Sequence, residues 1–387
     1  MLILALCQAL FVCGQTTFVF LGGLVGYSLA ADKSLATLPI SITILGTAMM
    51  TIPAALFMRR VGRRLGFMSG ALIGTVGVLI CAWAIYTANF ALFCTGALLA
   101  GFYNAFCQYY RFAAADAADE AFKSKAISLV LAGGVIAGFV GPAIATQTRD
   151  LLAPVTYLAS FVAVSGMSLL AMLLVSFVQI PNLSREEQRD TGRPLSQIMA
   201  QPVFIVAVLS AMIGYGVMSL VMTATPLAMV ACNFPDVDAG YVIQWHVLGM
   251  FAPSFFTGHL IARFGLYQIM LTGAAMLAAC VALTLSGIEF INFWLGLILL
   301  GLGWNFLFIG ATTLLTRVYT PAERAKTQAA NDFLVFAATA TASFLSGKLL
   351  HAYGWATVNY MAVPFIVLVT IVVVWLALRH RAERRPA

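Results

Sequence analysis

The chain has 387 residues, of which 62% are hydrophobic and 9% are charged. A soluble domain carries roughly 25% charged residues, so this composition excludes an ordinary soluble protein and indicates a chain that crosses a membrane many times. The net charge of +7 comes from Lys and Arg residues that gather at loop ends instead of on one basic face, and this argues against nucleic acid as a partner.

Twelve apolar segments are long enough to cross a bilayer, which takes about 20 residues in a helix. They are expected near 3–27, 36–58, 65–87, 91–112, 125–147, 153–179, 203–231, 240–262, 267–287, 292–315, 327–350 and 357–379. The first segment has neither a basic n-region nor a small-residue cleavage site, so we expect a retained helix and not a removed signal peptide. The sequence therefore predicts an all-α membrane protein with twelve transmembrane helices.

The positive charges are distributed unevenly between the two sides of the membrane. If the N-terminus is cytoplasmic, all 21 Lys and Arg residues except Lys33, Arg149 and Lys348 fall on the cytoplasmic side. Cytoplasmic loops of membrane proteins carry an excess of Lys and Arg, so we expect both termini in the cytoplasm and the lipid bilayer as the surroundings.

The two halves of the chain resemble each other. Residues 46–64 align with residues 249–267 at an offset of 203, and Asn104 aligns with Asn305 at an offset of 201. Parallel six-helix repeats are a design of secondary transporters. We therefore expect two pseudo-symmetric six-helix bundles, joined by a polar cytoplasmic linker, the second with a short basic cytoplasmic tail. Their expected bounds are 1–180 for the first bundle, 181–200 for the linker and 201–387 for the second bundle.

The loop after the second helix carries the run from Arg60 to Arg64. It resembles the signature loop of the major facilitator superfamily, G-x-x-x-D-R-x-G-R-[RK], with Ala55 in place of the first Gly and Arg59 in place of the Asp. The resemblance implies the major facilitator fold, with Arg60 and Arg63 taking part in gating. Because the Asp is missing, we expect both guanidinium groups to find acidic or carbonyl partners elsewhere.

Polar residues inside the first and fourth helices are candidates for a transport site. Gln15 is a candidate for the central cavity or for a hydrogen bond between helices, and Cys13 for a relay ligand or a small buried apolar residue. Asn104 begins the most polar run of the first half and is a further cavity candidate. Arg111, near the cytoplasmic end, is expected to extend to the interface or to pair with Asp116 in a gate.

The seventh and eighth helices contain two four-residue spacings of soft ligands. Met218 and Met222 share one helix face, and so do His246 and Met250. Thioether sulfur and imidazole nitrogen suit Cu(I), which makes the four residues a candidate metal site. The spacing alone fits equally well a hydrophobic core with one hydrogen-bonded histidine.

These stretches resemble the paired motifs of the CcoA-like copper importer family of bacterial major facilitator proteins. The resemblance implies that Met218, Met222, His246 and Met250 bind copper as the transported substrate. It further implies a bacterial inner-membrane protein that supplies haem–copper cytochrome oxidase assembly, with a cytoplasmic copper acceptor as a candidate partner. Relatives in the wider group are associated with riboflavin.

Three further residues of the second half are candidates. Trp245 and Asn305 are expected to line the cavity. Asp332, at the start of the eleventh helix, is a candidate proton acceptor, because a carboxyl group at that depth should have a raised pKa; a salt bridge or a helix cap is the alternative.

The sequence shows no constellation typical of an enzyme. Its seven Cys residues fit neither a zinc spacing nor a disulfide framework, and it contains no phosphate loop or hydrolytic motif. We expect a secondary transporter without an organic cofactor, importing Cu(I) by alternating access. Import of riboflavin or a similar organic solute is the first alternative, since Tyr103, Trp245 and Trp304 offer aromatic surface. Proton-linked drug efflux is the second, and a non-transporting membrane sensor ranks last.

Overall fold

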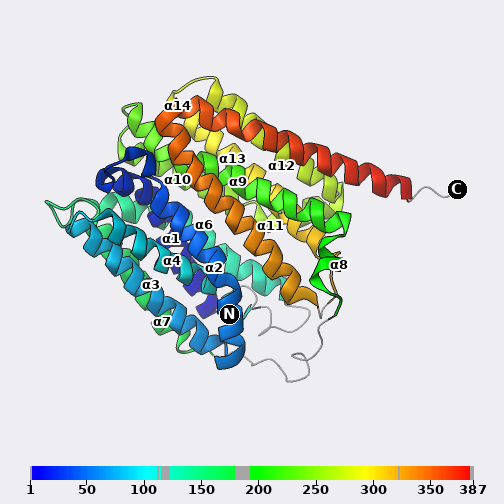
Figure 1. Ribbon diagram of the computed structural model, residues 1–387, viewed down its shortest axis with the longest axis horizontal. Coiled ribbons are helices and arrows are strands. Elements are labelled where there is room, and N and C mark those ends of the chain that lie inside the picture. Colours follow the sequence, from blue (N-terminus) through cyan, green and yellow to red (C-terminus); the bar gives the residue numbers. More distant parts are fainter. Residues whose placement is uncertain (1, 111–112, 115–122, 179–191, 321–322, 384–387) are drawn as a thin grey trace.

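A computed structural model describes the chain except for residues 1, 111–112, 115–122, 179–191, 321–322 and 384–387. The described residues fold into helices joined by short connections (Figure 1). In chain order these are α1 (Leu2–Leu29), the 3-10 turn η1 (Lys33–Leu35), α2 (Leu38–Val61), α3 (Arg63–Tyr86), α4 (Phe90–Cys107), α6 (Lys123–Gln147), α7 (Leu158–Val175), α8 (Leu195–Met199), α9 (Pro202–Ala231), α10 (Asp236–Phe251), α11 (Ser254–Phe264), α12 (Leu266–Leu285), α13 (Phe290–Leu315) and α14 (Arg324–Glu383).

The helices account for the twelve expected spans. Nine helices of the described residues are long and apolar enough to cross a membrane, and one of them, α14, contains two spans that meet at Gly354. Gly354 has a φ of 79°, which a residue without a side chain adopts without strain. The fifth span is α6, and the eighth is split into α10 and α11 at Pro253. The prediction of an all-α twelve-helix membrane fold is confirmed.

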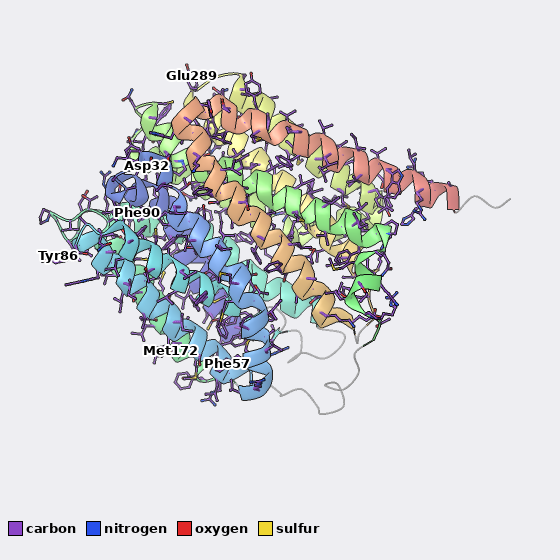
Figure 2. All side chains as sticks on the ribbon, viewed as in Figure 1. Asp32, Phe57, Tyr86, Phe90, Met172 and Glu289 are labelled. Atoms are coloured by element: carbon purple, nitrogen blue, oxygen red, sulfur yellow. The ribbon has the colours of Figure 1, made fainter. Side chains whose placement is uncertain are left out.

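Two groups of helices lie side by side in Figure 1, the first from α1 to α7 in blue to green-cyan and the second from α9 to α14 in green to red. Figure 2 shows Asp32, Tyr86 and Glu289 near one end of the helices and Phe57 and Met172 near the other, as expected for a chain that crosses back and forth. Most of the expected linker lies outside the described residues, and its last part forms α8.

The bundles repeat each other in the packing of their second and fourth helices. In the first bundle Thr43 of α2 donates a hydrogen bond to the carbonyl oxygen of Ala97 in α4, at 3.1 Å. In the second bundle Nδ1 of His246 in α10 bonds to the carbonyl oxygen of Leu297 in α13, at 2.8 Å. His246 thus occupies the position of Thr43, and both side chains tie one helix to the backbone of another.

Glycines at aligned positions fix the register of the repeat. Gly62 and Gly265 end α2 and α11 with φ values of 88° and 94°, which confirms the offset of 203 at this turn. A Cβ atom on Gly101 of α4 would lie 2.1 Å from the Thr43 carbonyl oxygen, and one on Gly301 of α13 would lie 2.5 Å from that of His246. This pair is 200 residues apart, so the expected offset of 201 is one residue too long, and Asn104 aligns with Trp304 instead of Asn305.

An ionic cluster joins the two bundles at one end. Nη1 of Arg149, which follows α6, lies 2.8 Å from Oδ2 of Asp236, the first residue of α10. The hydroxyl of Tyr157, just before α7, donates to the same carboxylate oxygen, and the Arg149 guanidinium lies 5.4 Å from the centre of the Tyr157 ring. We call Arg149, Tyr157 and Asp236 the latch. It holds the bundles together at the end where α6 and α7 meet α10.

The end of the linker is fixed to the second bundle. Nε and Nη2 of Arg193 lie 2.7 Å from the two carboxylate oxygens of Glu323, whose side chain is 2% exposed. The backbone N–H groups of Arg193 and Thr320 also donate to Glu323. These hydrogen bonds stabilise the carboxylate and hold the pKa of Glu323 well below its usual value.

Candidate functional site

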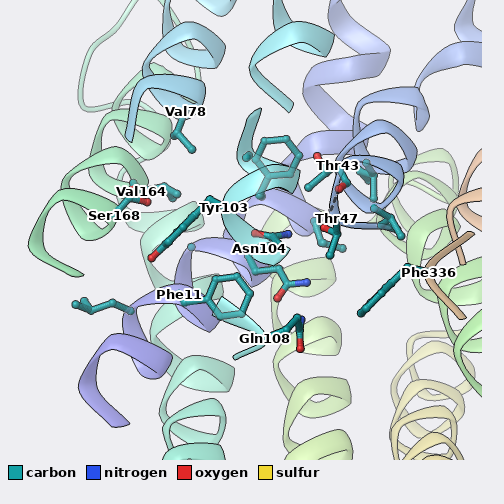
Figure 3. A pocket seen from close by; sticks show the side chains of 18 residues that line it. Phe11, Thr43, Thr47, Val78, Tyr103, Asn104, Gln108, Val164, Ser168 and Phe336 are labelled. Atoms are coloured by element: carbon teal, nitrogen blue, oxygen red, sulfur yellow. Dashed lines mark hydrogen bonds between the residues drawn. The ribbon is translucent and has the colours of Figure 1, made fainter. Parts of the chain in front are cut away.

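A cavity of about 60 Å³ lies in the first bundle, between α1, α2, α3, α4 and α7, and Phe336 of α14 reaches it from the second bundle (Figure 3). Every described residue that lines it is uncharged. The polar side chains in the lining are Gln15, Thr43, Thr47, Asn104, Gln108 and Ser168, and the aromatic ones are Phe11, Phe18, Tyr103 and Phe336. The cavity therefore combines aromatic surface with neutral hydrogen-bonding groups.

Three carboxamides are the most versatile polar groups of the cavity. Gln15 comes from α1 and Asn104 from the last turn of α4, and Gln108, four residues after Asn104, is the C-cap residue of α4. Within the described part of the chain, none of the three carboxamides has a hydrogen-bond partner. Each offers two N–H donors and an acceptor oxygen, so these groups are available to a solute in the cavity.

The threonines of the cavity also hold its walls together. Thr43 and Thr47 are one turn apart on α2, and their hydroxyls donate to the carbonyl oxygens of Ala97 and Gly101 in α4, each at 3.1 Å. The same hydroxyls also lie 3.0 Å from the carbonyl oxygens four residues earlier in α2. Their donors are therefore used within the protein, and their remaining role toward a solute is to accept.

Phe336 belongs to a cluster of aromatic rings from the second bundle. We call Tyr215 (α9), Phe251 (α10), Trp304 and Phe308 (α13) and Phe336 (α14) the aromatic wall. The Tyr215 ring centre lies 5.9 Å from that of Phe336 and 5.0 Å from that of Trp304, and the Trp304 and Phe308 rings are stacked 5.2 Å apart. The wall fixes the Phe336 ring at the boundary between the bundles.

The four expected copper ligands lie on α9 and α10, outside the lining of this cavity. Met218, His246 and Met250 are buried and Met222 is half-buried. The His246 side chain faces α13, where Nδ1 bonds to Leu297. A carbonyl oxygen only accepts hydrogen bonds, so Nδ1 carries the proton and Nε2 carries a free lone pair. Among the described residues, Nε2 is buried without a hydrogen-bond partner.

The structure places the expected cavity residues in different surroundings. Gln15 and Asn104 line the cavity of the first bundle. Cys13 is buried beside it but is not part of the lining, and Trp245 is 36% exposed and packs against Tyr241 and Trp294.

Asn305 faces the break between α10 and α11 instead of the cavity. Its Nδ2 donates to the carbonyl oxygen of Met250 at 2.6 Å and to the hydroxyl of Ser254 at 2.7 Å, and its Oδ1 accepts from Thr257 at 2.8 Å. A helix that ends at a proline leaves carbonyl oxygens without partners, and Asn305 satisfies one of them.

The expected gating and coupling residues are only partly described. Arg60 is exposed and Arg63 is half-buried. Arg111 and Asp116 lie outside the described residues. Asp332 is half-buried, and its Oδ1 accepts a hydrogen bond from Nδ2 of Asn331 at 3.1 Å, a local contact close to the start of α14.

Sequence reasoning missed three parts of the site. Thr43 and Thr47 could have been found, because threonines recur at every fourth residue of that helix and mark one face. Phe336 and the latch carried no such signal. Phe336 is one of 28 Phe residues, and Asp236 of the latch lies 79 residues after Tyr157.

The amino-acid sequence matches a family model and known transporters, in agreement with the fold described above. The family model described as Major Facilitator Superfamily matches residues 4–243 and 218–387. The riboflavin transporter RfnT of Brucella anthropi is 45% identical over 95% of this chain and 93% of its own length. The uncharacterized MFS-type transporter YddS of Bacillus subtilis is 25% identical over 92% of this chain and 86% of its own length.

Solved structures give the same architecture. The nucleoside transporter NupG superposes with a TM-score of 0.69 and 15% identity over 96% of this chain and 98% of that one. A bacterial homologue of the iron transporter ferroportin, in an outward-facing state, superposes with a TM-score of 0.67 and 16% identity over 97% and 98% of the two chains. These proteins are transporters and not enzymes, and the likeness to the solved structures concerns the fold alone. With its helices, its internal repeat and the family match over its length, this chain belongs to the Major Facilitator Superfamily of secondary transporters.

Proposed function

We propose that this protein transports riboflavin, or a closely related neutral organic solute, by alternating access. The observation that carries the proposal is the 45% identity with a riboflavin transporter along 95% of the chain. This relationship favours the organic-solute alternative of the sequence analysis over copper.

The chemistry of the cavity supports a neutral, flat solute. Riboflavin has a planar ring system with carbonyl and N–H groups at one edge and a polyhydroxylated chain at the other. Carboxamides and threonine oxygens suit those groups, and aromatic side chains suit the ring faces. The uncharged lining predicts that riboflavin is preferred over its phosphate esters, because a phosphate would lose its hydration without gaining a cation.

The volume of the cavity implies a conformational change during transport. It measures about 60 Å³, whereas sites for ligands of this size enclose about 300 Å³ or more. The two bundles must therefore separate before the solute enters. Separation at the latch and separation at the opposite end would open the site to the two sides in turn.

We further propose that both termini lie in the cytoplasm, on the basis of the Lys and Arg distribution. The bacterial inner membrane is proposed because the chain resembles bacterial major facilitator importers. In this orientation the latch lies on the outer side, and the expected direction is import.

Uptake by cells tests the proposal directly. A bacterial strain that neither synthesises riboflavin nor imports it is expected to grow at low external riboflavin only when it expresses this protein, and to accumulate labelled riboflavin. Cells with an empty vector serve as the control. Expression in the membrane without uptake would overturn the proposal, and net export would favour drug-type efflux.

Copper import is a second candidate because of one observation at His246. Nδ1 is held by the Leu297 carbonyl and Nε2 is buried with a free lone pair. Histidines that bind metals almost always donate their other ring N–H to such a partner. Met250 lies one turn away on the same face. Against copper, the equivalent Thr43 shows that this position also serves to join two helices.

Copper accumulation in the same cells distinguishes the two functions. Copper ligation predicts that His246→Ala and the double variant Met218→Leu, Met222→Leu lose copper uptake at normal expression, because Leu keeps the volume but lacks the sulfur. Met270→Leu, at a buried position of α12, is the matched control. Unchanged copper levels in the double variant would eliminate the copper candidate.

A further inference from the structure

We propose that Asn104 and Gln108 are the specificity-determining residues of the cavity and that they pair with the imide edge of a flat heterocyclic solute. The inference rests on the proposed function, because it assumes that a flavin-type solute enters this cavity. It assigns to two neighbouring carboxamides a task that aromatic contact cannot perform, namely the choice between solutes of the same shape.

The geometry of α4 brings the two carboxamides together. Residues four apart on a helix have their Cβ atoms about 5–6 Å apart on the same face. Figure 3 shows Asn104 and Gln108 next to each other, with Phe336 across the cavity from them. Asn104 is buried, with 8% of its surface exposed, and neither carboxamide is engaged elsewhere in the described chain. Gln108 is half-buried, and both carboxamides face the cavity, so their donors and acceptors are available to a ligand with the matching groups.

The hydrogen-bond patterns are complementary. The pyrimidine part of a flavin ring presents a carbonyl, an N3–H and a second carbonyl in a row, which is the pattern acceptor, donor, acceptor. A carboxamide presents a donor and an acceptor side by side. One carboxamide accepts from N3–H and donates to the neighbouring carbonyl, while the other donates to the second carbonyl. The ring faces then remain free to pack against aromatic side chains.

This pairing predicts how the protein discriminates between solutes. A site with buried hydrogen-bonding groups rejects an analogue that lacks the matching group far more strongly than an apolar pocket does. N3-methylriboflavin has lost the N3–H, whereas 5-deazariboflavin keeps the whole imide edge and replaces only N5 of the central ring with a C–H group. We therefore expect the first to bind poorly and the second to bind like riboflavin.

The test measures binding to the purified full-length protein by quenching of flavin fluorescence, and uptake in the cells described above. Wild type is expected to bind riboflavin and 5-deazariboflavin alike and N3-methylriboflavin about 10-fold or more weakly. Asn104→Leu and Gln108→Met keep the approximate side-chain shape without the hydrogen bonds. Each is expected to weaken riboflavin binding by about 3- to 10-fold and to reduce the discrimination against the methylated analogue. Gln268→Ala, an exposed carboxamide of α12, is expected to behave as wild type.

The outcomes separate this inference from the proposed function. Wild type that binds and transports riboflavin, with variants that keep the full discrimination, would overturn the pairing and leave the function intact. Equal binding of riboflavin and N3-methylriboflavin by wild type would also overturn it. Wild type that neither binds nor transports any of the three flavins would overturn the proposed function, and the pairing with it.

Discussion

The side chain of Asn305 shows how strongly neighbours decide what a polar residue does. Its amide makes three hydrogen bonds, to Met250, Ser254 and Thr257, around the interruption between α10 and α11. Asn104, near the same depth of the other bundle, instead turns its amide to the cavity. Two asparagines that look alike in the sequence therefore lie in different surroundings, one bonded to the protein and one facing the cavity.

The structural role of Asn305 predicts a loss of stability on substitution. Asn305→Leu keeps the volume but leaves the Met250 carbonyl without its donor, and we expect a cost of about 1–3 kcal/mol. Thermal unfolding of the purified protein in detergent measures this. Gln268→Ala, at an exposed position, should stay within about 0.5 kcal/mol of wild type. An Asn305 variant as stable as wild type would contradict the assigned role.

At this scale the sequence predicted some cavity residues and misplaced others. A four-residue spacing fixes which residues share a helix face, but it does not say which neighbour that face meets. Gln15 and Asn104 line the cavity, whereas His246 faces α13 and Trp245 faces the outside of the bundle.

Between helices, close packing depends on glycines at aligned positions. At Gly101 and Gly301 an added Cβ atom would lie 2.1 Å and 2.5 Å from backbone carbonyl oxygens, which cannot move aside as a flexible side chain would. The second and fourth helices of each bundle therefore approach closely only because Gly101 and Gly301 lack a side chain. Thr43 and His246 lie on the other side of these contacts.

Alanine at these glycines should separate the helices. We expect Gly101→Ala and Gly301→Ala each to cost about 1–3 kcal/mol through overpacking, and Gly101→Ala to lower uptake, because it displaces the wall that carries Asn104. Gly166→Ala in α7 is the matched control: a Cβ atom there meets nothing within 4 Å, and alanine should stabilise the helix by about 0.5–1 kcal/mol. Thermal unfolding and uptake are measured on the same preparations. Equal effects at the three positions would refute this explanation.

The attachment of the linker to α14 should depend on pH. The pKa of Glu323 is lowered in the folded protein, so its contribution is present above the pKa of the unfolded state, about 4.5, and is lost as the pH falls towards the folded value. We expect Glu323→Gln to be less stable than wild type at pH 7. The difference should shrink as the pH is lowered below about 4.5. A difference in unfolding temperature that is constant from pH 7 to pH 4 would contradict this.

For the molecule as a whole, the latch is one of the polar contacts that join the two bundles at one end of the helices. Its charges belong to different bundles, Arg149 to the first and Asp236 to the second, and Tyr157 adds a hydroxyl donor. Between α2 and α14, the hydroxyls of Ser41 and Ser343 also meet at 3.1 Å across the boundary of the bundles. Opening at this end must break all of these contacts together.

Removal of the latch should therefore favour opening at that end. In a Ser41→Cys background, Arg149→Ala and Asp236→Asn are expected to increase labelling by a membrane-impermeant maleimide and to slow uptake. The exchanged pair Arg149→Asp, Asp236→Arg should restore low labelling in part. Labelling that is the same with and without the latch would show that the cluster does not control opening.

The architecture followed from the sequence far better than the substrate did. Hydrophobic segments and aligned glycines such as Gly62 and Gly265 are dictated by the bilayer and by backbone geometry, and both leave a direct mark on the sequence. The cavity is assembled from six helices, and its members are common residue types. Motifs on two adjacent helices favoured copper, whereas the carboxamides that support an organic solute come together only in three dimensions.

The neutrality of the cavity also has a consequence for the energy source of transport. A carrier that moves a unit charge through the membrane potential gains or loses about 2.3 kcal/mol per 100 mV. Every described residue that lines the cavity is uncharged, and riboflavin is uncharged, so the loaded site would carry no charge through the electric field as the bundles rock. In liposomes, imposing a potassium diffusion potential should leave the initial rate of riboflavin uptake unchanged. Accumulation in cells would then follow from the solute's own gradient and from enzymes that phosphorylate it inside, which keep the free intracellular concentration low.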